Sequence, residues 1–281
     1  MNHPDYVKEL DINNPFEYKE IVFDKYRQPI VSIIIPVCNK WKFTYSCLQS
    51  IKKNTKGLSY EIIIIDDNSS DRTKDMRKII KNVKFIRNTK NKGFLKNCNG
   101  ASKYSSGKYL LFLNNDTIVL KDSILSLLNT IKNKKSVGAV GGKIILPNNT
   151  LQEAGCIIWK DASTSGYGVG KNPRLPEYNF VREVDYCSGA FFMTKKELFF
   201  KLGKFDVRYS PAYYEEVDYC MRLRKKNYRI LYQPLAEIIH FQSTSYEYDV
   251  SKKLVQKNKL KFFNKWHKKL SEHNSFDENN L

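Results

Sequence analysis

The residues of this chain with the clearest potential for chemistry lie in four polar loops, each of which directly follows an apolar run. The loop Asn114–Asp116 places two amides and a carboxylate immediately after Tyr109–Leu113. The other three loops contain Pro36–Asn39, Asp66–Asn68 and Gly93. Together these loops offer carboxylate oxygens, amides and, after Gly93, a helix start suited to a phosphate group.

Each loop also has a purely structural interpretation, which the sequence leaves open. Asp67 begins a stretch of Asn and Ser that suits a turn followed by a helix N-cap. Gly93 suits a turn, and Asn114–Asp116 suits a turn between two strands. The combination of four such loops is more informative than any one of them.

The apolar runs before the loops are typical of buried strands. Val31–Val37, Glu61–Asp66, Val83–Ile86 and Tyr109–Leu113 are rich in apolar and mostly β-branched residues. Apolar residues at helical spacing separate the runs, namely Phe43, Cys47, Leu48, Ile51, Met76, Ile79, Ile80 and those of a helix around Phe94–Ser105. This alternation predicts a parallel α/β sheet with right-handed crossovers, in which ligands bind beyond the carboxyl ends of the strands.

The second half of the chain continues the same domain without a clean boundary. Strands are expected at Val137–Ile145, Val184–Met193, Tyr228–Pro234 and Ala236–Phe241, and helices at 195–202 and 215–226. We expect residues 1–29 to form a lead-in or linker, residues 30–250 a single mixed α/β domain, and residues 251–281 a basic helix followed by a disordered tail.

The basic C-terminal helix has three possible roles. Leu254, Leu260, Phe263 and Trp266 are expected on one side of it, where they would pack on the domain. The helix is also suited to an anionic membrane surface, or to assembly with another protein.

The composition indicates a globular protein with an anionic partner. Hydrophobic residues make up 41% of the chain, and 48 basic against 29 acidic residues give a formal charge of +19. The six cysteines form no C-x-x-C pair, so we expect reduced thiols and neither a zinc site nor a disulfide framework. The sequence predicts neither a signal peptide nor a membrane span, so we expect a cytoplasmic protein, in peripheral contact with the inner face of the membrane as a further option.

The motifs of residues 30–245 resemble those of family 2 inverting glycosyltransferases of the GT-A fold. In chain order they are VSIIIPVCNK, EIIIIDDNSSD, NKGF, YLLFLNNDT, CSGAFFM, KFDVRY, EEVDYCMRLRKKNYRILY and IIH. The segment from LQEAGCIIW to CSGA also resembles a bacterial branch found in large polysaccharide-assembly proteins, often as one domain among several. The resemblance implies a mixed, mostly parallel sheet flanked by helices, with a Rossmann-like nucleotide-binding half and an acceptor-binding half.

The resemblance also assigns the donor side of a site. Asp67 is implied to accept a hydrogen bond from a uracil or thymine ring, and Asp116 and His240 to bind Mn²⁺ or Mg²⁺ at the donor diphosphate. Asn114 and Asn115 depart from the family's commoner Asp-x-Asp, and a structural role for His240 remains an alternative. The implied nucleotide-binding residues are Pro36, Val37, Asn39, Asp67, Gly93 and Asn115.

On the acceptor side, the resemblance places the catalytic base in the pair Glu215-Glu216, with Glu216 at the base position and Glu215 as competitor. A sugar hydroxyl is a poor nucleophile until a carboxylate removes its proton, although acidic residues also favour helix N-termini for structural reasons. The implied acceptor-binding residues are Ser188, Gly189, Ala190, Trp159 and Asp218, and Tyr167 and Tyr178 are further candidates for stacking on a sugar. Arg222 and Arg224 are candidates for phosphate contacts or for solvated surface.

The function that the resemblance implies is transfer of a sugar, with inversion, from a UDP- or dTDP-sugar to a glycan or lipid-linked glycan in surface polysaccharide biosynthesis. Two alternatives remain at this stage. A nucleotidyltransferase would also combine a metal, a nucleotide and an α/β sheet, but PVCNKWKF is not the Gly-rich loop expected of one. A basic nucleic-acid-binding module would explain the charge, but not the carboxylates at the strand ends, so we expect no nucleic-acid partner.

Overall fold

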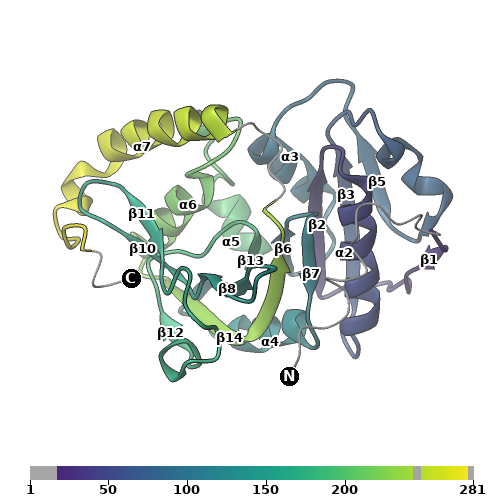
Figure 1. The fold of residues 1–281 in the computed structure, drawn as a ribbon, viewed down its shortest axis with the longest axis horizontal. Coiled ribbons are helices and arrows are strands. Elements are labelled where there is room, and N and C mark those ends of the chain that lie inside the picture. Colours follow the sequence, from purple (N-terminus) through teal and green to yellow (C-terminus); the bar gives the residue numbers. More distant parts are fainter. Residues whose placement is uncertain (1–17, 243–247, 278–281) are drawn as a thin grey trace.

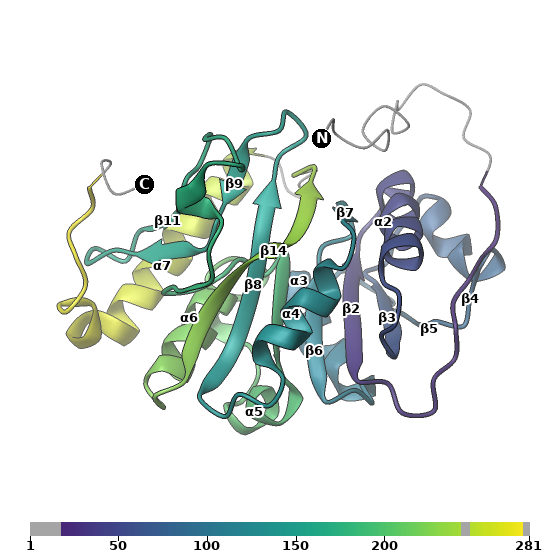
Figure 2. The same cartoon turned by 90° about the horizontal axis from the view of Figure 1, so that it is seen from below.

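A central ten-stranded mixed sheet organises the computed structural model, which describes residues 18–242 and 248–277. The strand order is β12-β14-β8-β13-β6-β2-β3-β5, with β7 paired to β14 and β9 paired to β8 (Figures 1 and 2). The first half contributes four parallel strands: β2 (Val31–Val37), β3 (Tyr60–Asp66), β5 (Lys84–Arg87) and β6 (Tyr109–Leu113). Their carboxyl ends therefore meet at one edge of the sheet, as the sequence predicts.

The second half of the sheet mixes parallel and antiparallel pairs. The strand β13 (Phe191–Lys195) runs antiparallel to both β6 and β8 (Val137–Ile145), and β14 (Arg229–His240) runs parallel to β8. The short strands β7 (Thr117–Val119), β9 (Leu151–Glu153) and β12 (Arg182–Glu183) extend this half. Two small sheets lie apart from it, β1 (Ile21–Val22) with β4 (Ile80–Lys81), and β10 (Cys156–Ile158) with β11 (Thr164–Gly166).

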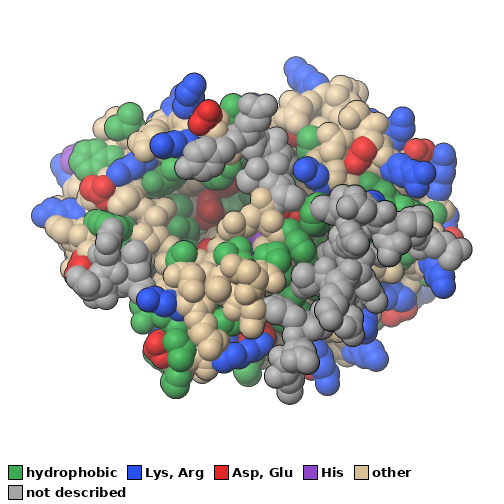
Figure 3. All heavy atoms as spheres, viewed as in Figure 1, with side chains coloured by type: hydrophobic (Ala, Val, Ile, Leu, Met, Phe, Trp, Pro, Cys, Tyr) green, Lys and Arg blue, Asp and Glu red, His purple; other side chains and the backbone are tan. Residues whose placement is uncertain are grey.

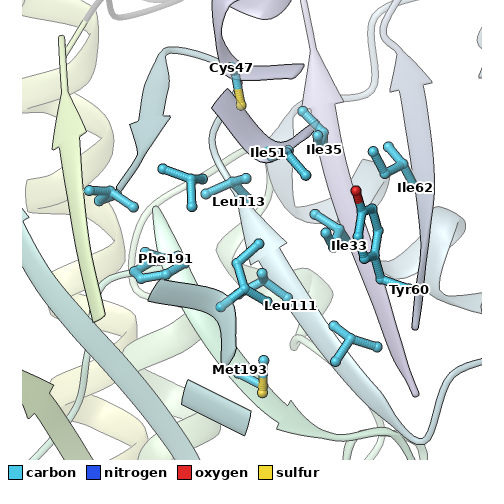
Figure 4. Close-up of a cluster of buried hydrophobic side chains, with 14 of the residues drawn as sticks. Ile33, Ile35, Cys47, Ile51, Tyr60, Ile62, Leu111, Leu113, Phe191 and Met193 are labelled. Carbon is cyan, nitrogen blue, oxygen red and sulfur yellow. The ribbon is translucent and has the colours of Figure 1, made fainter. Parts of the chain in front are cut away.

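Helices cover both faces of the sheet, because side chains of successive strand residues point to opposite faces. One apolar core joins Ile33, Ile35, Leu111 and Leu113 to α2 (Trp41–Asn54) and α4 (Ser123–Ile131) (Figure 4). The other joins Ile34, Ile63, Leu110 and Phe112 to the opposite layer of helices, which are α3 (Phe94–Ala101), α5 (Lys196–Lys201), α6 (Glu215–Arg224) and α7 (Tyr248–Leu270). Short 3₁₀-helices at Arg72–Lys78, Ser102–Tyr104, Pro176–Tyr178 and Val207–Tyr209 complete the described elements.

Several local expectations are wrong. Ile80 lies in the strand β4 and not in a helix, because the helix before it is a short 3₁₀ segment that ends at Lys78. Residues 184–190 are not part of β13, which begins at Phe191. The two strands expected at 228–234 and 236–241 form one strand, β14, with a bulge between Gln233 and Glu237.

The ends of the described chain are more ordered than expected. Residues 18–29 do not behave as a linker, since Ile21 and Phe23 are buried in the core and β1 pairs with β4. Near the other end, His273 Nδ1 lies 2.7 Å from the Ile158 carbonyl oxygen, and Phe276 packs edge-on against Trp159. The remaining residues of the expected tail, 278–281, lie outside the described part. Among the described helices, none combines the length and the apolar character needed to cross a bilayer.

Candidate active site

A pocket of about 490 Å³ lies at the carboxyl ends of β2, β3, β6 and β14, where the sequence predicts the polar loops to converge. Figure 3 shows a hollow near the centre of the molecule with acidic side chains on its floor. Twelve of the predicted site residues line the pocket, and they are Pro36, Val37, Asp67, Gly93, Asn115, Asp116, Ser188, Gly189, Ala190, Glu215, Glu216 and His240. The roles assigned to these residues stay predictions, but their convergence is now an observation.

Asp67 fixes the loop that closes one end of the pocket. Its Oδ1 accepts hydrogen bonds from Asn88 Nδ2 at 2.9 Å and from the Lys92 amide at 2.8 Å, and its Oδ2 accepts one from the Gly93 amide at 2.9 Å. Gly93 has φ +80°, and a Cβ there would lie 2.5 Å from Pro211 Cβ, so only glycine fits. The single N–H of the Gly93 amide is therefore used in a hydrogen bond to Asp67 and is not directed at a phosphate group.

Asn39 is predicted to bind nucleotide, but the structure gives it a different task. Its side-chain Oδ1 accepts hydrogen bonds from the backbone amides of Ser70 and Asp71. Its backbone amide donates to Ser69 Oγ at 2.7 Å. These bonds join the loop after β2 to the loop after β3, and Asn39 itself does not line the pocket. Asn39 thus shapes the pocket wall from behind, and Cys38 lines the pocket beside it.

Asp116 and His240 meet because β7 pairs with the end of β14. The chain leaves β6, turns through Asn114–Asp116 and enters β7, whose Thr117 is the partner of His240. The Phe241 amide donates to the Asp116 carbonyl at 3.0 Å, and His240 Nε2 lies 3.2 Å from Asp116 Oδ1. Asn115 is held beside them by a 2.9 Å hydrogen bond from its Nδ2 to Thr44 Oγ1. The turn therefore presents a carboxylate and an imidazole together at the pocket.

The surroundings of His240 direct its Nε2 toward Asp116. His240 Nδ1 lies 2.8 Å from Gln152 Oε1, and Nε2 lies 3.3 Å from Asn114 Nδ2. If Nδ1–H donates to Gln152, Nε2 carries one lone pair, which either accepts from Asn114 Nδ2 or binds a cation shared with Asp116 Oδ1. Adjacent ligands of an octahedral ion bound at about 2.1 Å are about 3 Å apart, so the observed 3.2 Å fits such an ion.

Glu215 and Glu216 occupy the first turn of α6 and line the same pocket as Asp116 and His240. Glu215 is buried, Glu216 is half-buried, and an Oε2 atom of each is buried without a hydrogen-bond partner among the described residues. Burial raises the pKa of Glu215 well above its ordinary value, with a further contribution from the neighbouring Glu216 carboxylate. Burial also raises the pKa of Glu216. Two such carboxyl groups are suited to holding and exchanging a proton.

The backbone before α6 is strained, which is common at functional sites. Tyr213 and Tyr214 both have φ +73°, in the left-handed region that non-glycine residues rarely adopt. Tyr214 is anchored by a 2.9 Å hydrogen bond from its hydroxyl to the Ala162 carbonyl, and Tyr213 lines the pocket. The strained turn aims the start of α6 at the pocket.

The segment Ser188–Ala190 faces Glu216 across the pocket. The Gly189 amide lies 3.5 Å from Glu216 Oε1, and Asn114 N donates to the Ala190 carbonyl at 3.0 Å. Behind this segment, Glu153 Oε1 accepts a 3.1 Å hydrogen bond from the Ser188 amide. Burial raises the pKa of Glu153 to about 6. Small side chains at these three positions leave room for a ligand next to Glu216.

Two predicted acceptor-binding residues do not reach the pocket. Trp159 is 1% exposed, and its Nε1 donates to Ser165 Oγ, so no ring face is left for a sugar. Asp218 is fully buried on the other side of α6, because residues two apart on a helix point in nearly opposite directions. It accepts from Arg222 Nε at 2.8 Å and from Trp266 Nε1 at 2.8 Å, and it pairs with Lys265.

The other side chains proposed for sugar or phosphate contacts are also occupied elsewhere. Tyr178 is buried in a small core with Leu151 and Tyr232, and it lies outside the pocket. Tyr167 packs under the Arg182 guanidinium, 4.1 Å from its ring centroid. Arg222 pairs with Asp218 and Arg224 with Asp185, so both arginines have structural partners.

Sequence reasoning missed Gln152 and Glu153, which support the two sides of the pocket. Gln152 contacts His240 and lines the pocket, whereas Glu153 holds Ser188. The available signal was a pair of polar residues inside the otherwise apolar segment LQEAGCII, at a strand that buries both faces. Phe94 and Asn97 on α3 also line the pocket, but nothing in their sequence context distinguishes them from ordinary helix residues.

The sheet topology and the strand-end pocket define the GT-A class of glycosyltransferases. The solved structure of GalNAc-T7 with UDP, GalNAc and Mn²⁺ aligns with a TM-score of 0.65 over 85% of this chain and 48% of that chain. The sequences are 16% identical, so this likeness establishes the fold alone.

The sequence places the chain in a family within that class. The profile of "Glycosyl transferase family 2" matches residues 32–203, and the chain belongs to this family. It is 28% identical over 229 residues to the O-antigen biosynthesis protein RfbC of Myxococcus xanthus, covering 77% of this chain and 18% of RfbC. It is 29% identical over 195 residues to poly-β-1,6-N-acetyl-D-glucosamine synthase of Staphylococcus aureus, covering 67% of this chain and 45% of the synthase. The chain thus spans less than half the length of these relatives. Membership of a glycosyl transferase family favours a glycosyltransferase over the nucleotidyltransferase and nucleic-acid-binding alternatives.

Proposed function

We propose that the chain is a metal-dependent inverting glycosyltransferase that moves a sugar from a UDP- or dTDP-sugar to a hydroxyl group of a glycan during surface polysaccharide assembly. The observation that carries this proposal is the convergence of Asp67, Asp116, His240 and Glu216 on one pocket, although they are far apart in the sequence. The names of the two relatives, one for O-antigen biosynthesis and one for a polymer of N-acetyl-D-glucosamine, support the polysaccharide context.

At the donor end, Asp67 suits recognition of a pyrimidine imide. A carboxylate offers about four acceptor positions, and the protein uses three of them on Asp67. The remaining position is on Oδ2, which suits an N–H group of uracil or thymine. Because both rings present the same N–H group, this contact accepts UDP and dTDP alike.

Asp116 and His240 would hold the divalent cation. When bound, such an ion stabilises the negative charge that develops on a leaving diphosphate. Gln152 orients the imidazole, and Asn115 keeps the turn in place through Thr44. Among the residues that the structure describes, Asp116 and His240 are the two candidate ligands here, so donor oxygens would complete the coordination.

At the acceptor end, Glu216 removes the proton from the attacking hydroxyl group. The hydroxyl oxygen forms a bond to the anomeric carbon of the donor sugar, and the bond from that carbon to the diphosphate oxygen breaks with its electron pair. Glu216 is suited to this task because its Oε2 has no hydrogen-bond partner among the described residues and its raised pKa makes it a stronger base. Glu215, which is more buried, holds a proton and stays neutral.

A donor screen tests the proposal. The purified chain is incubated with a panel of UDP- and dTDP-sugars and Mn²⁺, and released nucleoside diphosphate is measured with and without candidate glycan acceptors. We expect release to require the cation and to fall with Glu216→Gln, and we expect NMR to show inverted anomeric configuration in the product. Retained configuration, or equal release after metal chelation, would contradict the proposal.

A further inference from the structure

The helix α7 is fixed to the domain through a face that includes Trp266, as expected, but neither Leu260 nor Phe263. Phe262 and Leu270 are fully buried and Trp266 is 8% exposed. Between them, Asn258 Nδ2 donates to the carbonyl groups of Tyr209, Ala212 and Tyr213, at 2.8, 2.9 and 3.0 Å. These contacts lock α7 to the segment before α6, so the opposite side of the helix is free to face outward.

The outer face of α7, formed by Lys253, Lys257, Leu260, Phe263 and Lys268, combines lysines with large apolar side chains. Leu260 is 65% exposed and Phe263 is 41% exposed, although the sequence pattern predicts both to be inside. Figure 1 places α7 along the upper left edge of the molecule, and Figure 3 shows basic and hydrophobic side chains mingled over that edge. Exposed apolar residues are common on this protein, but Leu260 and Phe263 lie one helical turn apart and among lysines, which is the combination found on helices that lie on anionic membranes.

Most of the positive charge on α7 is not neutralised. The helix contains eight lysines and a single acidic residue, Asp249. Lys259, Lys265 and Lys269 pair with carboxylates. In the described part of the chain, the other five have no carboxylate partner, and these are Lys252, Lys253, Lys257, Lys261 and Lys268. Partial desolvation, together with the nearby charge of Lys257, lowers the pKa of Lys261, which indicates mutual repulsion on this side of the helix.

A basic cleft of about 540 Å³ continues this surface beside α7. Its cationic lining residues come from α3 and the 3₁₀-helix that follows it, from the segment between α5 and α6, and from the helices α6 and α7. They are Lys96, Lys103, Lys204, Arg208, Arg222 and Lys265. Asp206 is the carboxylate of the lining, and it is already paired with Arg208 and Lys265. Val207 stands on the rim and is 61% exposed. Lys261 Nζ donates to the Arg208 carbonyl and so joins the cleft to the outer face of α7.

We propose that the outer face of α7 and the adjacent basic cleft dock the protein on an anionic phospholipid bilayer. Lysines near such a surface are attracted to its negative potential, and exposed Leu, Phe and Val side chains insert at the boundary between headgroups and acyl chains. Nucleic acid would instead favour several stacking aromatic rings, whereas the outer face of α7 presents Phe263 alone. This surface is separate from the pocket lining, so the proposal does not depend on the transfer chemistry.

Co-sedimentation with vesicles tests the proposal. The 281-residue chain is mixed with vesicles of phosphatidylcholine alone, or of equal parts phosphatidylcholine and phosphatidylglycerol. We expect binding to the anionic vesicles only, with a loss at high salt as the Debye length falls from about 10 Å at 0.1 M to about 3 Å at 1 M. Absence of binding to anionic vesicles at low salt would overturn the proposal.

Matched variants separate this surface from the general charge of the protein. Leu260→Glu is compared with Leu235→Glu, since Leu235 is an exposed leucine on β14 and the charge change is identical. The double variant Lys253→Ala/Lys257→Ala is compared with Lys56→Ala/Lys121→Ala, which removes two exposed lysines elsewhere. Loss of about 1 kcal/mol per lysine corresponds to about fivefold in affinity for each, so we expect about 25-fold weaker binding for the first pair and less than threefold for the second.

Two outcomes would contradict the inference even if vesicles bind. Equal losses in the matched pairs would show that net charge alone drives binding. A dimer in light scattering that Leu260→Glu dissociates would show that a second copy of the chain covers this face. Unchanged thermal unfolding of each variant is the control for folding.

Discussion

Replacing Glu216 by glutamine is the sharpest test of the proposed chemistry. Glutamine has nearly the same shape, and its Oε1 can still accept from the Gly189 amide, so the pocket should keep its form. What is lost is the ability to take a proton. Removal of a general base typically costs 10²- to 10⁴-fold in rate, which corresponds to about 3 to 5 kcal/mol of activation free energy.

The size of this effect depends on the neighbouring carboxyl group. Glu215 is the more buried of the two, and the Glu216 charge adds to the rise in its pKa, so we expect Glu215 to be the one that keeps a proton when the pair loses one. Glu215→Gln imitates the protonated state, and we expect it to change kcat by less than tenfold. In the wild type, activity should rise with pH through a raised carboxyl pKa, because the base acts only when deprotonated. The same rise of activity with pH should persist in the Glu215→Gln variant.

The assay is initial-rate release of nucleoside diphosphate across pH 4 to 9, combined with calorimetric measurement of nucleotide binding. We expect Glu216→Gln to lose kcat while the nucleotide Kd stays within about twofold of the wild type. Its unfolding temperature should not fall, because the variant removes one of two adjacent buried carboxylates. A Glu216→Gln variant with near-normal kcat, or a Glu215→Gln variant that alone is inactive, would refute the assignment.

Three further perturbations test the supporting structure. Asp116→Asn should weaken Mn²⁺-dependent nucleotide binding by at least tenfold in calorimetry and leave binding in EDTA unchanged; equal affinities with Mn²⁺ would remove Asp116 from the metal site. Glu153→Gln should make the protein more stable to urea at pH 8 by up to about 2 kcal/mol and should change little at pH 4, because a folded pKa of about 6 against an ordinary 4.5 means that folding stability is lost as pH rises between these values. The same gain at both pH values would contradict a proton on Glu153. Asp218→Asn should destabilise the fold by about 3 to 5 kcal/mol, because Arg222 and Lys265 would lose their buried carboxylate partner; a change below 1 kcal/mol would show that the pairs are dispensable.

The strands and their loops could be predicted because their signals are local. Each of the runs around Ile33, Ile63 and Leu111 is a continuous apolar segment, and a parallel sheet necessarily gathers the loops that follow such strands. The placement of Asp67 and Asp116 then follows from topology alone. For Glu216 and His240, the spacing along the sequence does not predict a position at the pocket. Both residues are predicted to belong to the site only from the family resemblance.

The wrong predictions share a different cause, which is that they depend on tertiary partners. Trp159 has the aromatic ring that stacking on a sugar requires, but the β10–β11 hairpin and Phe276 enclose it. On α7, Leu260 and Phe263 were placed inside because they are apolar, yet the structure buries the polar Asn258 instead. Asn258 is favoured there because its amide satisfies three carbonyl groups that α7 would otherwise cover. The sequence of the helix alone does not predict that these carbonyl groups lie beside Asn258.

The positions of Asp116 and His240 show how strand register can control the geometry of the pocket. Between Gln233 and Glu237, β14 bulges relative to β8, since these residues pair with the consecutive Gly142 and Lys143. Beyond the bulge, β14 pairs with β7 so that His240 is opposite Thr117, next to Asp116. Side chains alternate along a strand, so a register slip of one residue would turn His240 away from Asp116 and bring Ile239 to its place. The length of this bulge, which lies outside the pocket lining, therefore decides whether the imidazole of His240 and the carboxylate of Asp116 lie together at the pocket.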